Sequence, residues 1–170
     1  MKLQTINAIG AARRIRRAVN RSTVRSVIIH AGRMKTGSTF LQNALLENVE
    51  NLNEHGWLFP KSLWQFAQYQ IKDRVLRSTG HASIARISLN QFVERDTVNA
   101  FVKELEETTC ERLILSAENI GRDARDQTIW NLAHAFDGID TRIVMYLRRP
   151  SNWVNSIYVE KVTGGNARES

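Results

Sequence analysis

The sequence predicts an α/β fold in which a central parallel sheet is flanked by helices. Three apolar segments have the pattern of buried strands, at 27–29, 112–115 and 142–147, and segments with helical spacing of apolar residues separate them. Parallel strands need long crossover connections, so this alternation favours a parallel sheet covered on both faces. A chain of 170 residues fits one domain with a sizeable core.

The first part of the chain, up to residue 90, has two clear elements and two less regular segments. The β-branched run at 27–29 predicts a strand buried on both faces, and apolar residues at helical spacing predict a helix over 39–49. Residues 56–60 are a short apolar segment ended by proline, which indicates a brief strand or a buried loop. Residues 61–90 have a mixed pattern, for which we expect one or two helices.

The second half continues the alternation of helices and strands. A strong apolar face predicts a helix over 91–107, followed by the strand at 112–115 and a helix over 126–136. The strand at 142–147 comes next, and Pro150 stands where the first turn of a helix tolerates proline. Because the carboxyl ends of parallel strands meet at one edge of the sheet, we expect the loops that follow the three strands to form one site.

The net charge of +7 belongs to the N-terminal segment. Residues 1–25 hold seven of the 24 lysines and arginines, the first acidic residue is Glu47, and the other 17 basic residues balance 17 acidic ones. We therefore interpret residues 1–25 as a basic N-terminal extension, either solvated or a surface helix, rather than as a nucleic-acid footprint. An organelle transit peptide has a similar composition.

Two further features bear on location. The N-terminal segment has no apolar stretch long enough for a signal peptide or a membrane span. The single Cys110 cannot form an internal disulfide and is compatible with a reducing compartment, so we expect a cytoplasmic protein.

The segment SVIIHAGRMKTGSTFLQN, residues 26–43, carries the clearest chemical signal. An apolar strand leads into a turn bracketed by Gly32 and Gly37, and the opening of a helix follows. A helix N-terminus presents backbone N–H donors and the positive end of the helix dipole, so it binds phosphate or sulfate well. The pattern indicates a nucleotide-type cofactor.

The loop differs from the Walker A loop, G-x-x-x-x-G-K-[ST]. Gly32 and Gly37 have the right separation, but Ser38 stands where the lysine belongs, and the lysine is Lys35. No predicted strand ends directly in an aspartate that suits a magnesium ion. A sulfuryl group carries less charge than a phosphoryl group, so its transfer fits a site with arginines and no metal.

Two motifs together resemble those of sulfotransferases that use 3′-phosphoadenosine 5′-phosphosulfate. HAGRMKTGSTFLQ is similar to their 5′-phosphosulfate loop, especially the bacterial form H-x-G-x-x-K-T-G-[ST]-T-x-L-Q. RIVMYLRRPSNWVNSIY resembles their second signature, in which Arg148 closes a strand and Ser156 follows eight residues later. The resemblance implies a P-loop-NTPase-like three-layer fold and identifies residues 26–170 as a sulfotransferase-like α/β domain. Relatives continue well past the second signature, so we interpret this domain as truncated at its C-terminus.

The resemblance also implies roles for individual residues. Lys35 would contact the phosphosulfate bridge and stabilise charge on the leaving oxygen, and Arg148 and Ser156 would bind the 3′-phosphate. Phe40 stands where many relatives stack an aromatic ring on adenine, although it can equally pack in the core. The 5′-phosphate would be bound by Thr36, Gly37, Ser38 and Thr39.

The general base is a separate question. Glu118 follows the second strand, and some carbohydrate-directed relatives use a glutamate there, so we assign Glu118 as the base, with a helix cap or an ion pair as the alternative role. His30 ends the first strand and is expected to support the loop, while His55 and His81 are alternative bases.

The sequence therefore predicts a sulfotransferase with 3′-phosphoadenosine 5′-phosphosulfate as co-substrate and no metal. The acceptor would be a hydroxyl or amine, on a carbohydrate or a small molecule, and this truncated form can be inactive. A P-loop nucleotide kinase or NTPase is the second hypothesis. The third is a non-catalytic remnant that binds anionic partners through residues 1–25. We expect no membrane span and no nucleic-acid partner.

Overall fold

The computed structural model describes residues 4–32, 36–71, 74–117, 120 and 126–163. Its helices are α1 (Ala8–Arg21), α2 (Ser38–Glu47), α3 (Val49–Glu54), α4 (Ala82–Ser88), α5 (Arg95–Glu107), α6 (Asp126–Ala135) and α7 (Pro150–Thr163). Its strands are β1 (Thr5–Ile6), β2 (Ser26–Ala31), β3 (Trp57–Leu58), β4 (Gln65–Ile71), β5 (Arg74–Gly80), β6 (Val93–Glu94), β7 (Arg112–Ala117) and β8 (Asp140–Val144).

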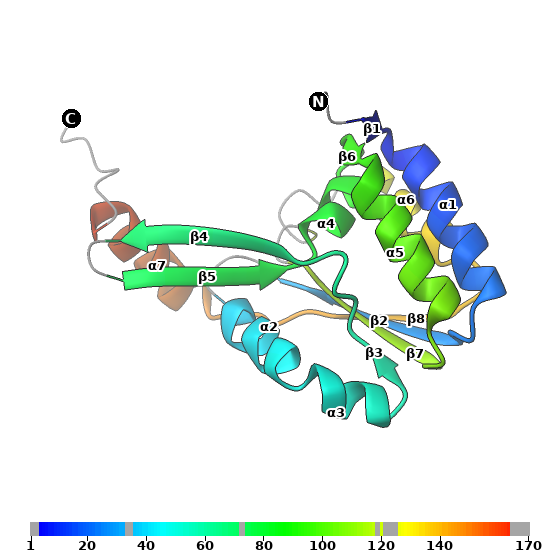
Figure 1. The fold of residues 1–170 in the computed structure, drawn as a ribbon. Coiled ribbons are helices and arrows are strands. Elements are labelled where there is room, and N and C mark those ends of the chain that lie inside the picture. The colour runs from blue at the N-terminus through cyan, green and yellow to red at the C-terminus, as the bar shows by residue number, and fades with distance from the viewer. Residues whose placement is uncertain (1–3, 33–35, 72–73, 118–119, 121–125, 164–170) are drawn as a thin grey trace.

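The centre of the fold is a four-stranded sheet in the order β3-β7-β2-β8, and all of its pairings are parallel. The inner strands β2 and β7 are apolar because helices cover them, and Val27, Ile29, Leu113 and Leu115 are fully buried. Helices α1, α4, α5 and α6 lie on one face of the sheet, and α2 and α3 lie on the other (Figure 1). The predicted α/β class, with a parallel sheet between helices, is confirmed.

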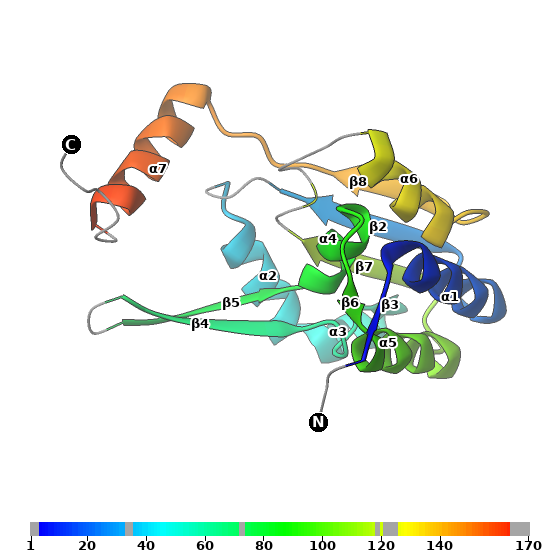
Figure 2. The ribbon, with the colours of Figure 1, turned by 90° about the horizontal axis from the view of Figure 1, so that it is seen from above.

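The basic N-terminal segment is a folded part of this domain. Asn7 caps α1 by accepting a hydrogen bond from the N–H of Gly10, at 2.8 Å. The buried face of α1 packs in the main core and consists of Ala8, Ala11, Ala12, Ile15, Ala18 and Val19. We expected the basic extension over residues 1–25 to be either solvated or a surface helix, and residues 8–21 form a helix whose alanine face packs against α5 and α6 (Figure 2). The arginines of α1 lie on its outer face.

Residues 61–90 contain one helix, in line with the expected one or two, and also two strands that were not expected. Strands β4 and β5 form an antiparallel hairpin, in which Ile71 pairs with Arg74 and Gln65 with Gly80, and only α4 is helical. The hairpin extends away from the main sheet, and β5 lies against α2 (Figure 1). The two strands contain aromatic and β-branched residues, which favour strands, among them Phe66, Tyr69 and Val75.

The third predicted strand ends earlier than expected. β8 covers Asp140–Val144 rather than residues 142–147, because β2, its one neighbour among the described strands, ends at Ala31 and the last pair is His30 with Val144. The residues that follow cannot continue the ladder, and Leu147 is 81% exposed. Arg148 consequently lies in the connection to α7 and does not close the strand. No helix in the described part of the chain is long and apolar enough to cross a membrane.

Candidate functional site

The carboxyl edge of the sheet collects the connections that follow β2, β7 and β8. In the registers of the two ladders, His30 of β2 pairs with Ser116 of β7 on one side and with Val144 of β8 on the other. The chain segments that leave these three strands therefore start side by side. This is the convergence that the sequence predicts, and it is the usual ligand-binding edge of an open parallel sheet.

Helix α2 begins at this edge with the expected strand–loop–helix geometry. Gly37 is the N-cap residue and has a φ of +92°, in the left-handed region that favours glycine. Its carbonyl accepts hydrogen bonds from the N–H groups of Phe40 and Leu41, at 3.1 and 3.3 Å. The first turn of α2 contains no acidic residue, so nothing there opposes an anion at the positive end of the helix dipole.

The predicted phosphate-binding residues have different exposures. Thr36 is half-buried, Ser38 is buried and Thr39 is exposed, so Thr39 is the most accessible hydroxyl of the three. Phe40 is 82% exposed, which rules out the core-packing alternative and leaves its ring on the surface beside the loop. Lys35 and Glu118 lie outside the described residues, and their roles stay predictions.

A buried polar network holds the strand ends beneath this loop. His30 Nδ1 lies 2.8 Å from Ser116 Oγ, and the ring of Tyr146 packs against the His30 ring with centroids 5.3 Å apart. A Cβ on Gly32 would stand 3.5 Å from His30 Nε2, so the imidazole lies directly under the start of the loop. These contacts support the predicted role of His30 and tie together the residues that follow β2 and β8.

His81 completes the network from the other side of β7. Strand β3 is two residues long and pairs with Arg112 and Leu113, so among the described strands none pairs with Ser116 on that side. Its N–H donates to His81 Nδ1 at 3.2 Å, and its carbonyl accepts from the His81 N–H at 2.8 Å. Since His81 Nδ1 accepts, the neutral ring carries its proton on Nε2, which is buried without a hydrogen-bond partner of good geometry.

Neither alternative histidine suits the role of general base. Burial lowers the pKa of His81 to about 3, partly opposed by the backbone carbonyl of Pro60, and the side chain is 0% exposed, so no acceptor can reach it. His55 lies between α3 and β3, at the amino edge of the sheet, and its Nδ1 is 2.8 Å from the Asn51 carbonyl. The structural role of His81 was missed because it depends on a contact 35 residues away in the chain.

The second predicted motif brings its two residues together. Arg148 Nη1 donates to Ser156 Oγ at 3.3 Å. Arg148 precedes α7 and is exposed, whereas Ser156 lies in the second turn of the helix and is half-buried. The first hydrogen bond of α7 runs from the Trp153 N–H to the carbonyl of Arg149, at 2.9 Å. The exposed guanidinium and the half-buried hydroxyl that accepts its hydrogen bond thus lie together beyond the carboxyl edge.

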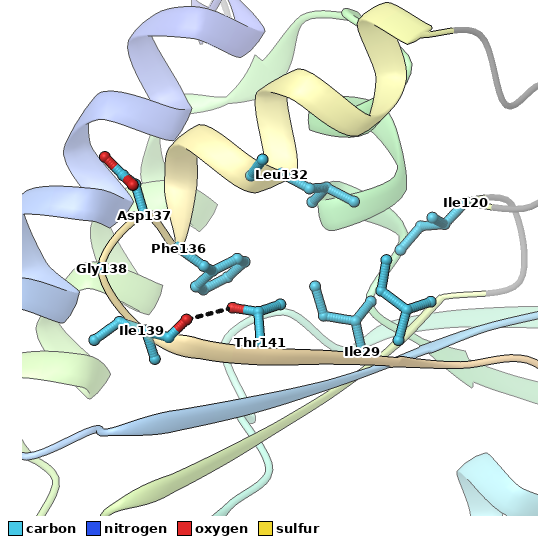
Figure 3. A pocket seen from close by; sticks show the side chains of 10 residues that line it. Ile29, Ile120, Leu132, Phe136, Asp137, Gly138, Ile139 and Thr141 are labelled. Atoms are coloured by element: carbon cyan, nitrogen blue, oxygen red, sulfur yellow. Dashed lines mark hydrogen bonds between the residues drawn. The ribbon is translucent and has the colours of Figure 1, made fainter.

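A separate apolar cavity lies between α6 and the strands β2 and β8 (Figure 3). Its volume is about 330 Å³, and Ile29, Leu132, Phe136 and Ile143 are among its lining residues. The hydroxyl of Thr141 is engaged with the Ile139 carbonyl at 3.1 Å, and Asp137 points away from the cavity. The described residues that line it are mostly apolar.

The possible metal ligands and the comparisons with known proteins complete the description of the site. Among the described residues, no three His, Cys, Asp or Glu side chains lie close enough together to hold a metal ion. No model of a known protein family, no curated protein and no solved structure matches this chain.

Proposed function

We propose that this chain has a P-loop-NTPase-like fold, binds 3′-phosphoadenosine 5′-phosphosulfate and transfers its sulfuryl group to a hydroxyl or amine acceptor. The main support is the placement of two anion-binding elements beyond one edge of the sheet. One is the N-terminus of α2, after β2, and the other is the Arg148–Ser156 pair, after the neighbouring strand β8. A ligand with phosphate groups at two separate positions suits this arrangement.

In this proposal each end of the nucleotide has its own partners. The 5′-phosphosulfate lies at the start of α2, where Thr36, Gly37, Ser38 and Thr39 offer hydroxyl and N–H donors. The 3′-phosphate accepts hydrogen bonds from Arg148 and Ser156, whose donors already lie together. The exposed ring of Phe40 is available to stack on adenine.

The proposed reaction is an in-line displacement at sulfur. The acceptor oxygen or nitrogen attacks the sulfur while the bond between sulfur and the bridging phosphate oxygen breaks, which releases 3′-phosphoadenosine 5′-phosphate. Glu118 takes the proton of the acceptor, a step usually worth about 10²–10⁴ in rate. Lys35 stabilises the charge on the leaving oxygen, and removal of such a group typically costs ~10²–10³ in rate.

Calorimetry with 3′-phosphoadenosine 5′-phosphate tests the assignment without requiring turnover. Loss of the guanidinium in Arg148→Ala should weaken binding roughly 10- to 100-fold, the usual effect of losing a hydrogen bond to a charged group. Arg149→Ala is a matched control, because it removes the same charge from the adjacent residue, which contributes its carbonyl to α7.

The nucleotide comparison in the same assay is decisive. AMP lacks the 3′-phosphate and should bind the wild-type chain as weakly as the full nucleotide binds Arg148→Ala. Equal binding of AMP and 3′-phosphoadenosine 5′-phosphate, or binding of ATP that depends on Mg²⁺, would reject the proposal, the latter in favour of a kinase or NTPase.

A further inference from the structure

A second site for anions is suggested by the outer face of α1. One stripe along the helix, opposite its buried alanines, carries four polar residues at i, i+3, i+4 and i+7. They are Arg13, Arg16, Arg17 and Asn20. Together with His134 of α6 they line a cleft with a volume of about 300 Å³. Three arginines, of which Arg13 and Arg17 are exposed and Arg16 is half-buried, thus line one concave surface.

One ion pair organises this cleft without neutralising it. Asp137, just after α6, forms a salt bridge with Arg16 at 2.5 Å. Figure 3 shows the Asp137 side chain directed away from the apolar cavity and toward α1. This salt bridge positions the Arg16 guanidinium and compensates its positive charge. Within the described part of the chain, Arg13 and Arg17 have no acidic partner, and like charges four residues apart destabilise a helix.

The cleft and the proposed nucleotide site lie toward opposite edges of the sheet. Helix α1 leads into the amino end of β2, and α6 leads into the amino end of β8, so the ends of these helices adjoin the amino edge of the sheet. The proposed nucleotide site is at the carboxyl edge. The whole net charge of the chain also comes from residues 1–25, since the other basic and acidic residues balance.

We propose that the α1–α6 cleft binds a compact anion with more than one phosphate or sulfate group, with Arg13 and Arg17 as its principal ligands. Planar guanidinium groups donate two parallel hydrogen bonds to such oxyanions, and they remain charged at any physiological pH. His134 and Asn20 contribute further donors at the rim. A multivalent anion would also remove the repulsion between the two unpaired arginines.

Titration calorimetry with inorganic tripolyphosphate tests this proposal on the full chain. The double variant R13Q/R17Q should lower the affinity by at least about tenfold, as expected when charge-assisted hydrogen bonds are lost. The matched control R14Q/R21Q removes the same charge from the same helix, but neither residue lines the cleft, and Arg14 donates instead to Asn99. The control should stay within about twofold of the wild type, the effect of a charge outside the contact.

Three outcomes would overturn the site. Equal weakening by the two double variants would show diffuse attraction to a basic helix, and absence of binding to the wild-type chain at millimolar tripolyphosphate would show no site. Titrations repeated with saturating 3′-phosphoadenosine 5′-phosphate should give the same affinity, whereas competition would place the anion at the nucleotide site instead.

Vesicles with and without a phosphorylated inositol lipid, tested with the same variants, distinguish a lipid headgroup from a free anion as the source.

Discussion

His30 and Ser116 join the carboxyl ends of two neighbouring parallel strands through a hydrogen bond of 2.8 Å between Nδ1 and Oγ. The two residues are register partners in the β2–β7 ladder, and both side chains are buried. His30 lies directly under Gly32, where the proposed phosphate loop begins. The position of the loop therefore depends on a polar contact within the core, and this contact can be tested separately from ligand binding.

Ser116→Ala should lower the free energy of unfolding by about 1–3 kcal/mol, because it leaves the buried Nδ1 of His30 without its partner. Urea unfolding of the purified variant measures this loss. Ser151→Ala is the matched control, since Ser151 is an exposed residue in the first turn of α7. A Ser116→Ala variant as stable as this control would show that the hydrogen bond has no structural importance.

His81 should make the stability depend on pH below neutrality. Its pKa is about 3 in the folded chain against 6.5 in the unfolded chain, so over that interval the unfolded state binds a proton that the folded state does not. The free energy of unfolding should be highest above pH 6.5 and should fall as the pH decreases toward 3. The expected slope is about 1.4 kcal/mol per pH unit, with a total near 4–5 kcal/mol.

Urea unfolding at pH values from about 7 to 5 tests this prediction before most carboxylates titrate. His81→Phe removes the titrating group and keeps an aromatic ring beside Phe59, whose ring centroid is 4.6 Å away. This variant should be less stable at neutral pH, since the Ser116 N–H loses its acceptor, but its slope should be smaller. His81→Gln offers a second non-titrating side chain. Equal slopes in all three proteins would disprove the role of His81.

The sequence predicted the parts of the fold that depend on local patterns. The strand–loop–helix unit around Gly37 and the helix that starts at Pro150 were both found where spacing and turn residues indicated them. Arg148 and Ser156 also come together, because eight residues across a helix start return the two side chains to the same side. In each case the residues that predict the feature lie close to it in the sequence.

Contacts between distant segments were not predictable in the same way. The end of β8 at Val144 depends on where β2 ends, more than a hundred residues earlier. The buried role of His81 depends on the short length of β3, which exposes the Ser116 backbone. The burial of α1 was hidden by its arginines, because charge is conspicuous in a sequence whereas an alanine face is not.

Ile15→Ala tests whether the basic N-terminal segment belongs to the core. Ile15 is 1% exposed and part of the main core cluster, so its truncation should cost about 2–4 kcal/mol of unfolding free energy. Ile9→Ala makes the same chemical change on the same helix at a residue that is 44% exposed, and it should cost less than about 1 kcal/mol. Similar losses from both variants in urea unfolding would mean that α1 is not anchored through this face.

Gly37 and Gly138 allow the conformational and the ligand-binding contributions of the loop to be separated. Both have a left-handed backbone, with φ of +92° and +87°, and a Cβ on either would meet nothing within 4 Å. Replacement by alanine should therefore destabilise both proteins by a similar amount, roughly 1–2 kcal/mol, through backbone strain alone.

Gly37 adjoins the proposed phosphate site, whereas Gly138 lies between α6 and β8 at the amino edge. Only Gly37→Ala should weaken binding of 3′-phosphoadenosine 5′-phosphate, by about tenfold or more, because strain relieved at the N-cap moves the N–H donors of α2. Matched stabilities measured by urea unfolding, together with unequal affinities measured by calorimetry, would assign the difference to the ligand; unchanged affinity in Gly37→Ala would place the phosphate elsewhere.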